Sequence, residues 1–205
     1  MVVGRTFGGQ NDAAGKSIPQ DYTTKVVDSL MKDFAQNLPG VYSSRSFSSE
    51  PAAFAGQKNA MRNCAVALYQ DLRNQVMNSE RGIKTENEKR RELRWNYRGI
   101  AKHVLDNGGF DKTTVLVAAA LAAKTILDGK ENFRDEHISI AVEELVLFVH
   151  AKVGAAAAEH VTNMLKREYP KLKLERAELL QSQQRLQDQY GPVKDWRERY
   201  GRFER

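Results

Sequence analysis

Hydrophobic positions recur every three or four residues along most of this chain, which is the period of an amphipathic α-helix. Alternation of period two, which would indicate strands, is absent from these stretches. Pro39 and Gly40 end the first hydrophobic stripe, because neither residue continues a helix readily. The pattern predicts helices over about residues 21–37, 51–78, 85–107, 111–128, 134–169 and 172–190.

Capping and breaking residues set the limits of several of these helices. Thr85 and Glu88 fit a capping box, in which the hydroxyl and the carboxylate accept hydrogen bonds from free backbone N–H groups. Gly108 and Gly109 end the helix that starts there, because glycine adopts the left-handed conformation at low cost. Gly154 predicts a break or a kink within the long stretch 134–169.

One predicted helix lacks a polar face. Residues 115–123 read Val-Leu-Val-Ala-Ala-Ala-Leu-Ala-Ala, so that every side of the helix is apolar. A helix of this kind must be surrounded by protein, and its alanines allow neighbouring helices to approach closely. We therefore expect it to be the central helix of a bundle.

These elements predict an all-α fold, a helical bundle of about six or seven helices. The chain has 205 residues, enough for one well-buried domain. We predict a single α-helical domain over residues 21–190, with a Ser-rich linker at 41–50. Residues 1–20 are interpreted as an extended, flexible N-terminal arm, and residues 191–205 as a basic, aromatic C-terminal tail.

The composition excludes several classes of protein. Hydrophobic residues make up 41% and charged residues 28%, and no apolar run reaches the roughly 20 residues that cross a bilayer. The first residues lack the basic and apolar pattern of a secretory signal, so we expect a cytoplasmic (or virion) protein without membrane contact. The lone cysteine, Cys64, cannot form an internal disulfide and is expected to be a small buried hydrophobic residue.

The closest approach to an enzyme signature is the stretch from Gly9 to Ser17, which resembles a phosphate-binding P-loop. Five residues separate Gly9 from Gly15 where the P-loop has four, and no buried strand precedes them. A P-loop needs that strand and the helix after it to aim backbone N–H groups at phosphate. We therefore interpret this stretch as part of the arm.

The remaining candidates for chemistry do not form a set. The four histidines have neither His-Glu-x-x-His nor Glu-x-x-His spacing, so they predict no metal site. Glu143 and Glu144 are adjacent and point in different directions on a helix, where we expect a solvated face. We predict no catalytic residue, no cofactor and no small-molecule substrate, and hence a protein that is not an enzyme.

Charge is distributed unevenly along the chain, whose net charge is +6. Residues 61–105 carry 10 basic and 5 acidic groups and residues 166–205 carry 11 and 7, whereas residues 106–165 carry 5 and 9. Within the first basic segment, four cations fall within about 80° of one another on the helix that starts near residue 85. They are Arg91, Arg94, Arg98 and Lys102, and Trp95 borders them.

This basic stripe has two interpretations. Guanidinium groups one turn apart can follow a phosphate chain, while an adjacent indole stacks on a base. In the alternative, the arginines pair with Glu88, with Glu92 or with the acidic segment 106–165. The sequence leaves both interpretations open.

The tail repeats the combination of cations and aromatic rings. Its aromatic residues lie at i, i+4 and i+7, so a short helix would gather them on one face. This face should bury against its own bundle, a neighbouring subunit, a partner or a nucleic acid. The candidate partner-binding residues are Trp196, Arg197, Arg199, Tyr200, Arg202 and Phe203.

Two hypotheses of function follow. The first is an assembly subunit that binds nucleic acid through its phosphate backbone, such as a virion coat protein, a nucleoprotein or a small subunit of a nucleoprotein complex. This hypothesis expects self-assembly or a multi-subunit complex. The alternative is a protein-interaction adaptor or secreted effector that docks through the aromatic tail.

Overall fold

A computed structural model describes residues 20–41, 56, 58–66, 68–69, 71, 86–106, 110–128 and 135–191. Within these ranges all regular structure is helical, which confirms the predicted all-α bundle. The helices are α1 (Gln20–Asn37), α3 (Glu86–Ala101), the π-helix η2 (Lys102–Asp106), α4 (Lys112–Asp128), α5 (Asp135–Lys152), α6 (Ala155–Glu168) and α7 (Glu175–Tyr190). Residues 58–66 are helical as well.

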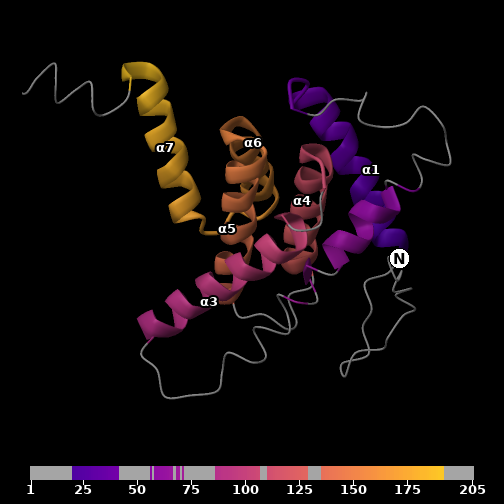
Figure 1. Ribbon diagram of the computed structural model, residues 1–205, viewed down its shortest axis with the longest axis horizontal. Coiled ribbons are helices and arrows are strands. Elements are labelled where there is room, and N and C mark those ends of the chain that lie inside the picture. Colours follow the sequence, from indigo (N-terminus) through magenta and orange to yellow (C-terminus); the bar gives the residue numbers. More distant parts are fainter. Residues whose placement is uncertain are drawn as a thin grey trace, which may run out of the picture.

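The apolar helix α4 lies at the centre, as its sequence predicts. Thirteen of its 17 residues are buried, from Thr113 to Leu127. It packs against α1, α5 and α6, while α3 crosses the ends of the upright helices from one side (Figure 1). The burial follows from the run of Ala, Val and Leu, because a helix without a polar face is stable only when it is enclosed.

The long predicted stretch 134–169 is divided into α5 and α6 at Gly154. The amide N–H groups of Val153 and Gly154 both donate to the carbonyl of Val149, at 2.8 and 3.2 Å, and this closes the end of α5. Gly154 then takes a φ of 138°, a conformation that side chains with a Cβ rarely adopt. The predicted break is confirmed, and it allows α6 to fold back along α5.

Helix α1 docks on the bundle through the stripe that the sequence predicts. Val27, Leu30 and Phe34 are buried in the core. The imidazole of His160 on α6 lies with its Nε2 atom 2.5 Å from Oδ2 of Asp33 on α1. The same ring meets that of Phe34 edge to face, with 5.9 Å between the ring centroids. A hydrogen bond and a ring contact therefore reinforce the apolar seam between α1 and α6.

One boundary differs from the prediction. The last helix begins at Glu175, not at residue 172, because residues 171–174 alternate between solvent and core. Leu172 and Leu174 are buried while Lys171 and Lys173 are exposed, which is the period of an extended chain and not of a helix.

In the described ranges, no helix is long and apolar enough to cross a membrane.

Candidate nucleic-acid interface

Helix α3 presents two different faces. Leu93, Tyr97 and Ala101 fill the core on one side, at the spacing expected of an amphipathic helix. On the opposite side Trp95 is 73% exposed, the largest exposure of any large hydrophobic residue in the described chain. Arg91 and Lys102 are exposed as well. The outer face of α3 therefore carries an accessible indole with cations on the same side of the helix.

Arg94 and Arg98 point along the flank of α3, toward α5. Arg94 Nη1 donates to Glu143 Oε2 at 2.7 Å, and Arg98 Nε donates to Glu144 Oε2 at 3.3 Å. The carboxylate side chains are only 4% and 2% exposed, whereas the guanidinium side chains are 31% and 50% exposed. The structure therefore pairs these two arginines of the predicted stripe with the acidic segment of the same chain.

The start of α7 supplies a second partner to each carboxylate. The backbone N–H of Arg176 donates to Glu143 Oε1 at 2.6 Å, and its guanidinium Nη1 donates to Glu144 Oε1 at 2.5 Å. The expectation of a solvated face at Glu143 and Glu144 is thus wrong. α3 and the first turn of α7 cover this side of α5, so that two adjacent carboxylates both find donors although they leave the helix in different directions.

This arrangement joins three helices around two buried negative charges. Each carboxylate oxygen accepts a hydrogen bond from a charged donor or from a backbone N–H at a helix start, and this offsets the cost of removing the carboxylates from water. The arginine side chains that pair with the buried carboxylates are themselves partly exposed to solvent. We refer to Glu143, Glu144, Arg94, Arg98 and Arg176 as the carboxylate cluster.

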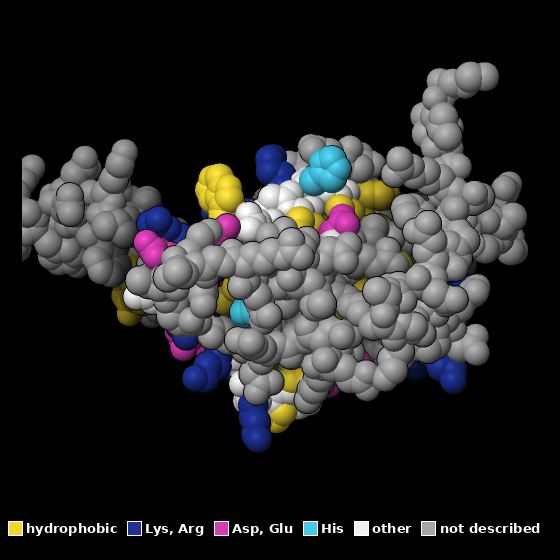
Figure 2. Space-filling view, turned by 90° about the horizontal axis from the view of Figure 1, so that it is seen from below, with side chains coloured by type: hydrophobic (Ala, Val, Ile, Leu, Met, Phe, Trp, Pro, Cys, Tyr) yellow, Lys and Arg dark blue, Asp and Glu magenta, His cyan; other side chains and the backbone are white. Residues whose placement is uncertain are grey.

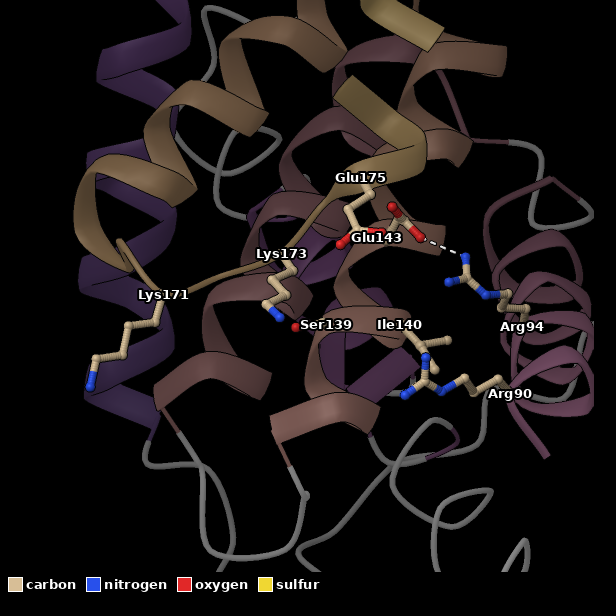
Figure 3. Close-up of a pocket in the computed structure, with 8 residues that line it drawn as sticks. All are labelled: Arg90, Arg94, Ser139, Ile140, Glu143, Lys171, Lys173 and Glu175. Carbon is tan, nitrogen blue, oxygen red and sulfur yellow. Dashed lines mark hydrogen bonds and ion pairs between the residues drawn. The ribbon is translucent and has the colours of Figure 1, made fainter. Parts of the chain in front are cut away.

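A cleft of about 410 Å³ opens beside the carboxylate cluster. It is bounded by the first half of α3, by α5 and by the segment that joins α6 to α7 (Figure 3). The lining comprises four cations, two carboxylates, one hydroxyl and one aliphatic side chain, so the groups that face it carry a net charge of +2. These residues are Arg90, Arg94, Ser139, Ile140, Glu143, Lys171, Lys173 and Glu175.

The two lysines of the cleft differ from the three arginines of the carboxylate cluster. Lys171 and Lys173 are exposed, and neither has an ion-pair partner among the described residues. In the close-up, the side chain of Lys173 points toward Ser139, while Lys171 extends away toward the edge of the group (Figure 3). Seen from below, Lys and Arg side chains also stand out around the rim of the described surface (Figure 2).

Lys171 and Lys173 are not among the residues predicted from the sequence, although the sequence contains a signal for them. The stretch Lys-Leu-Lys-Leu at 171–174 follows Pro170 and alternates strictly, which predicts an extended segment with both lysines on one side. Extending the last helix back to residue 172 concealed that pattern. Arg90 was also missed, because it lies outside the narrow angular range of the predicted stripe.

Buried groups elsewhere offer little reactivity. Cys64 is buried, as expected, and burial raises the pKa of its thiol to about 12, so that it stays protonated at neutral pH. Burial also raises the pKa of the Tyr97 hydroxyl. Among the described residues, no group of three or more His, Cys, Asp or Glu side chains is placed to hold a metal ion.

Several predicted features lie outside the described residues. These are the P-loop-like stretch at 9–17, most of the arm, the linker after residue 41 and the capping residue Thr85. The tail candidates Trp196, Arg197, Arg199, Tyr200, Arg202 and Phe203 also lie outside them. The candidate interface is therefore built from α3, α5 and the segment before α7.

Comparisons with known proteins return no match: no family model, no curated protein and no solved structure is significantly similar to this chain.

Proposed function

We propose that this chain is a non-enzymatic assembly subunit that binds nucleic acid through its phosphate backbone. A virion coat protein, a nucleoprotein or a small subunit of a nucleoprotein complex, acting in the cytoplasm or in a virion, fits this proposal. The observation that carries it is the basic cleft, in which four cations face two carboxylates beside a helix that exposes a tryptophan. Such a surface suits a polyanion with aromatic bases.

The cations of the cleft divide into those that hold the fold and those that remain available. Arg94 is bound to Glu143, so most of its positive charge compensates a buried negative charge. Lys171 and Lys173 lack such partners among the described residues and face water. In the proposal they neutralise phosphates and release the counterions condensed on the nucleic acid, which is the main source of affinity in backbone recognition.

Trp95 supplies the second part of the interface. An indole that is 73% exposed is costly to leave in water, and on this helix it is flanked by cations. Every base has an aromatic face, so stacking on Trp95 would add affinity without strong sequence preference. Among the stripe residues, Arg91 on α3 and Lys102 at the start of η2 are exposed and would contact the backbone next to the stacked base.

The carboxylate cluster contributes by positioning. It fixes the flank of α3 against α5 and fixes the start of α7 against the same helix. The segment 171–174 precedes α7 directly, so the cluster also determines where Lys171 and Lys173 lie relative to Trp95. Arg94 and Arg98 thus support the interface mainly through the fold.

Fluorescence anisotropy with a labelled single-stranded RNA of about 20 nucleotides tests the proposal at low salt. We expect the double variant Lys171→Ala, Lys173→Ala to bind about tenfold more weakly than the unmodified protein. The matched control is Lys25→Ala, Lys32→Ala, which removes two exposed lysines of α1 and should bind within about twofold of the unmodified protein. No binding by the unmodified protein, or an equal loss in both double variants, would contradict the proposal.

A further inference from the structure

Three large hydrophobic side chains of the last helix, α7, are exposed and do not pack into the bundle. Leu179 is 60% exposed, Leu186 is 51% exposed and Tyr190 is 50% exposed. At 100° per residue these three side chains lie within about 40° of one another. They form a stripe on α7 that faces away from the rest of the described chain, and we call it the outer stripe.

The side of α7 that faces the bundle is largely polar. The amide of Gln181 donates to the hydroxyl of Thr162 at 2.9 Å, and both residues are buried. On either side of this contact, Glu178 forms an ion pair with Lys166, and Arg185 forms one with Glu159. α7 therefore attaches to the bundle by hydrogen bonds and ion pairs together with the buried Ala177 and the half-buried Leu180, whereas Leu179 and Leu186 are exposed.

From Leu179 onward the outer stripe has no charged neighbour; one turn earlier, Glu175 lies on the same face, and Arg176 beside it is paired with Glu144. From Leu179 to Tyr190, the positions within about 80° of the stripe are Ser182, Gln183, Gln187 and Gln189, all of them neutral. The charged residues of this stretch, Arg185 and Asp188, lie on the other side of the helix. A chain with 28% charged residues thus leaves one half of an exposed helix uncharged over three turns.

We infer that the outer stripe pairs with the outer stripe of a second copy of this chain, with the two α7 helices antiparallel. A two-fold axis places the stripe against an identical stripe, so a face that carries charges of one sign would repel its copy, whereas a neutral face does not. A strongly charged partner such as nucleic acid would instead favour a basic face. The inference rests on the self-assembly part of the proposed function and specifies where that assembly occurs.

The spacing of the stripe fits the antiparallel arrangement. Leu179 and Leu186 are seven residues apart, the repeat by which helices pack along a common seam. With the axis between Ser182 and Gln183, Leu179 of one copy lies against Leu186 of the other, and the small Ser182 allows close approach at the crossing. Three large side chains per copy make a small interface, and interfaces below about 1,200 Å² are weak. We therefore expect a dimer that forms at micromolar concentrations.

Sedimentation equilibrium over about 1–200 µM tests this inference, because weak pairing makes the mean mass depend on concentration. We expect the mass to rise toward that of a dimer, and the double variant Leu179→Gln, Leu186→Gln to weaken dimerisation at least tenfold. Both side chains are exposed, so the fold should be kept, as circular dichroism checks. A monomer at every concentration would overturn the inference.

Cross-linking tests the antiparallel geometry. Leu179→Cys and Leu186→Cys are prepared separately in a Cys64→Ala background, mixed and oxidised. A disulfide-linked dimer that forms in the mixture, and not with either variant alone, is the expected result, because only antiparallel helices place position 179 opposite position 186. Linked dimers of each variant alone would indicate a parallel pair and would overturn the arrangement.

A third comparison separates this inference from nucleic-acid binding. The variant Lys171→Ala, Lys173→Ala should dimerise like the unmodified protein, while Leu179→Gln, Leu186→Gln should keep its affinity per subunit for the labelled RNA within about threefold. Dimerisation without RNA binding would support the outer stripe and reject the proposed function. Loss of RNA binding in the leucine variant without any change in mass would show that nucleic acid covers the stripe, and would reject the dimer.

Discussion

The arginines on the flank of α3 and the lysines before α7 carry the same charge and lie in or beside the same cleft, yet their surroundings differ. Arg94 and Arg98 each donate to a carboxylate that is at most 4% exposed. Lys171 and Lys173 face water without an ion-pair partner in the described chain. The number of cations on a helix therefore does not identify a binding surface. The carboxylates around the cations decide whether they stabilise the fold or remain available to a ligand.

The largest effect is expected from the double variant Arg94→Ala, Arg98→Ala. Within the described chain, Glu143 loses its only side-chain cation and Glu144 loses one of two, so the free energy of unfolding should fall by about 3 kcal/mol. Urea denaturation followed by circular dichroism measures this loss. Arg91→Ala is the matched control on the same helix, and it should change the free energy of unfolding by less than about 0.5 kcal/mol. An equal loss of stability in the two variants would show that the arginines paired with buried carboxylates do not stabilise the fold more than an exposed arginine does.

A smaller loss of stability is expected from Glu144→Gln. Each oxygen of Glu144 accepts from a different arginine, and an amide must place an NH₂ group against one of these donors. The free energy of unfolding should fall by about 2 kcal/mol, within the range for hydrogen bonds to charged groups. Glu159→Gln, whose ion pair with Arg185 is exposed, should cost less than about 0.5 kcal/mol in the same denaturation experiment. A loss of similar size in both variants would show that burial does not set the value of these pairs.

Trp95→Ala should affect binding and not folding. Loss of one stacked base costs about 1 kcal/mol at the low end of the observed range, which is about a fivefold weaker affinity for single-stranded RNA. The free energy of unfolding should stay within about 0.5 kcal/mol, because the side chain is mostly in water. Tyr190→Ala, which removes another exposed aromatic ring away from the cleft, serves as the control. An unchanged affinity of Trp95→Ala for the RNA would show that the indole is not part of the interface.

Much of the fold could be predicted because the relevant signals are local. The apolar run of α4, the stripe of α1 and the break at Gly154 each follow from a few neighbouring residues, and the structure confirms all three. The limits of α7 were less accurate, because four residues can satisfy a period of two as well as a helical period. Residues 171–174 follow the shorter period, which keeps Leu172 and Leu174 in the core.

The candidate site depends on contacts that no local pattern encodes. Glu143 lies 49 residues from Arg94 and 33 from Arg176, and only packing brings the three together. The sequence offered pairing with the acidic segment as one of two interpretations of the stripe, and it did not specify the carboxylates. Two adjacent glutamates on a helix read as a solvated face until α3 and α7 are placed on either side of them. The basic cleft follows from the same packing.

The salt dependence of RNA binding reports directly whether the lysines of the cleft contact phosphates. On single strands, the slope of log affinity against log salt concentration is about −0.7 per neutralised phosphate. If Lys171 and Lys173 each contact one phosphate, the slope of Lys171→Ala, Lys173→Ala should be shallower than that of the unmodified protein by about 1.4, while Lys25→Ala, Lys32→Ala keeps the original slope. Identical slopes in all three proteins would contradict the assignment of the cleft as a phosphate-binding surface.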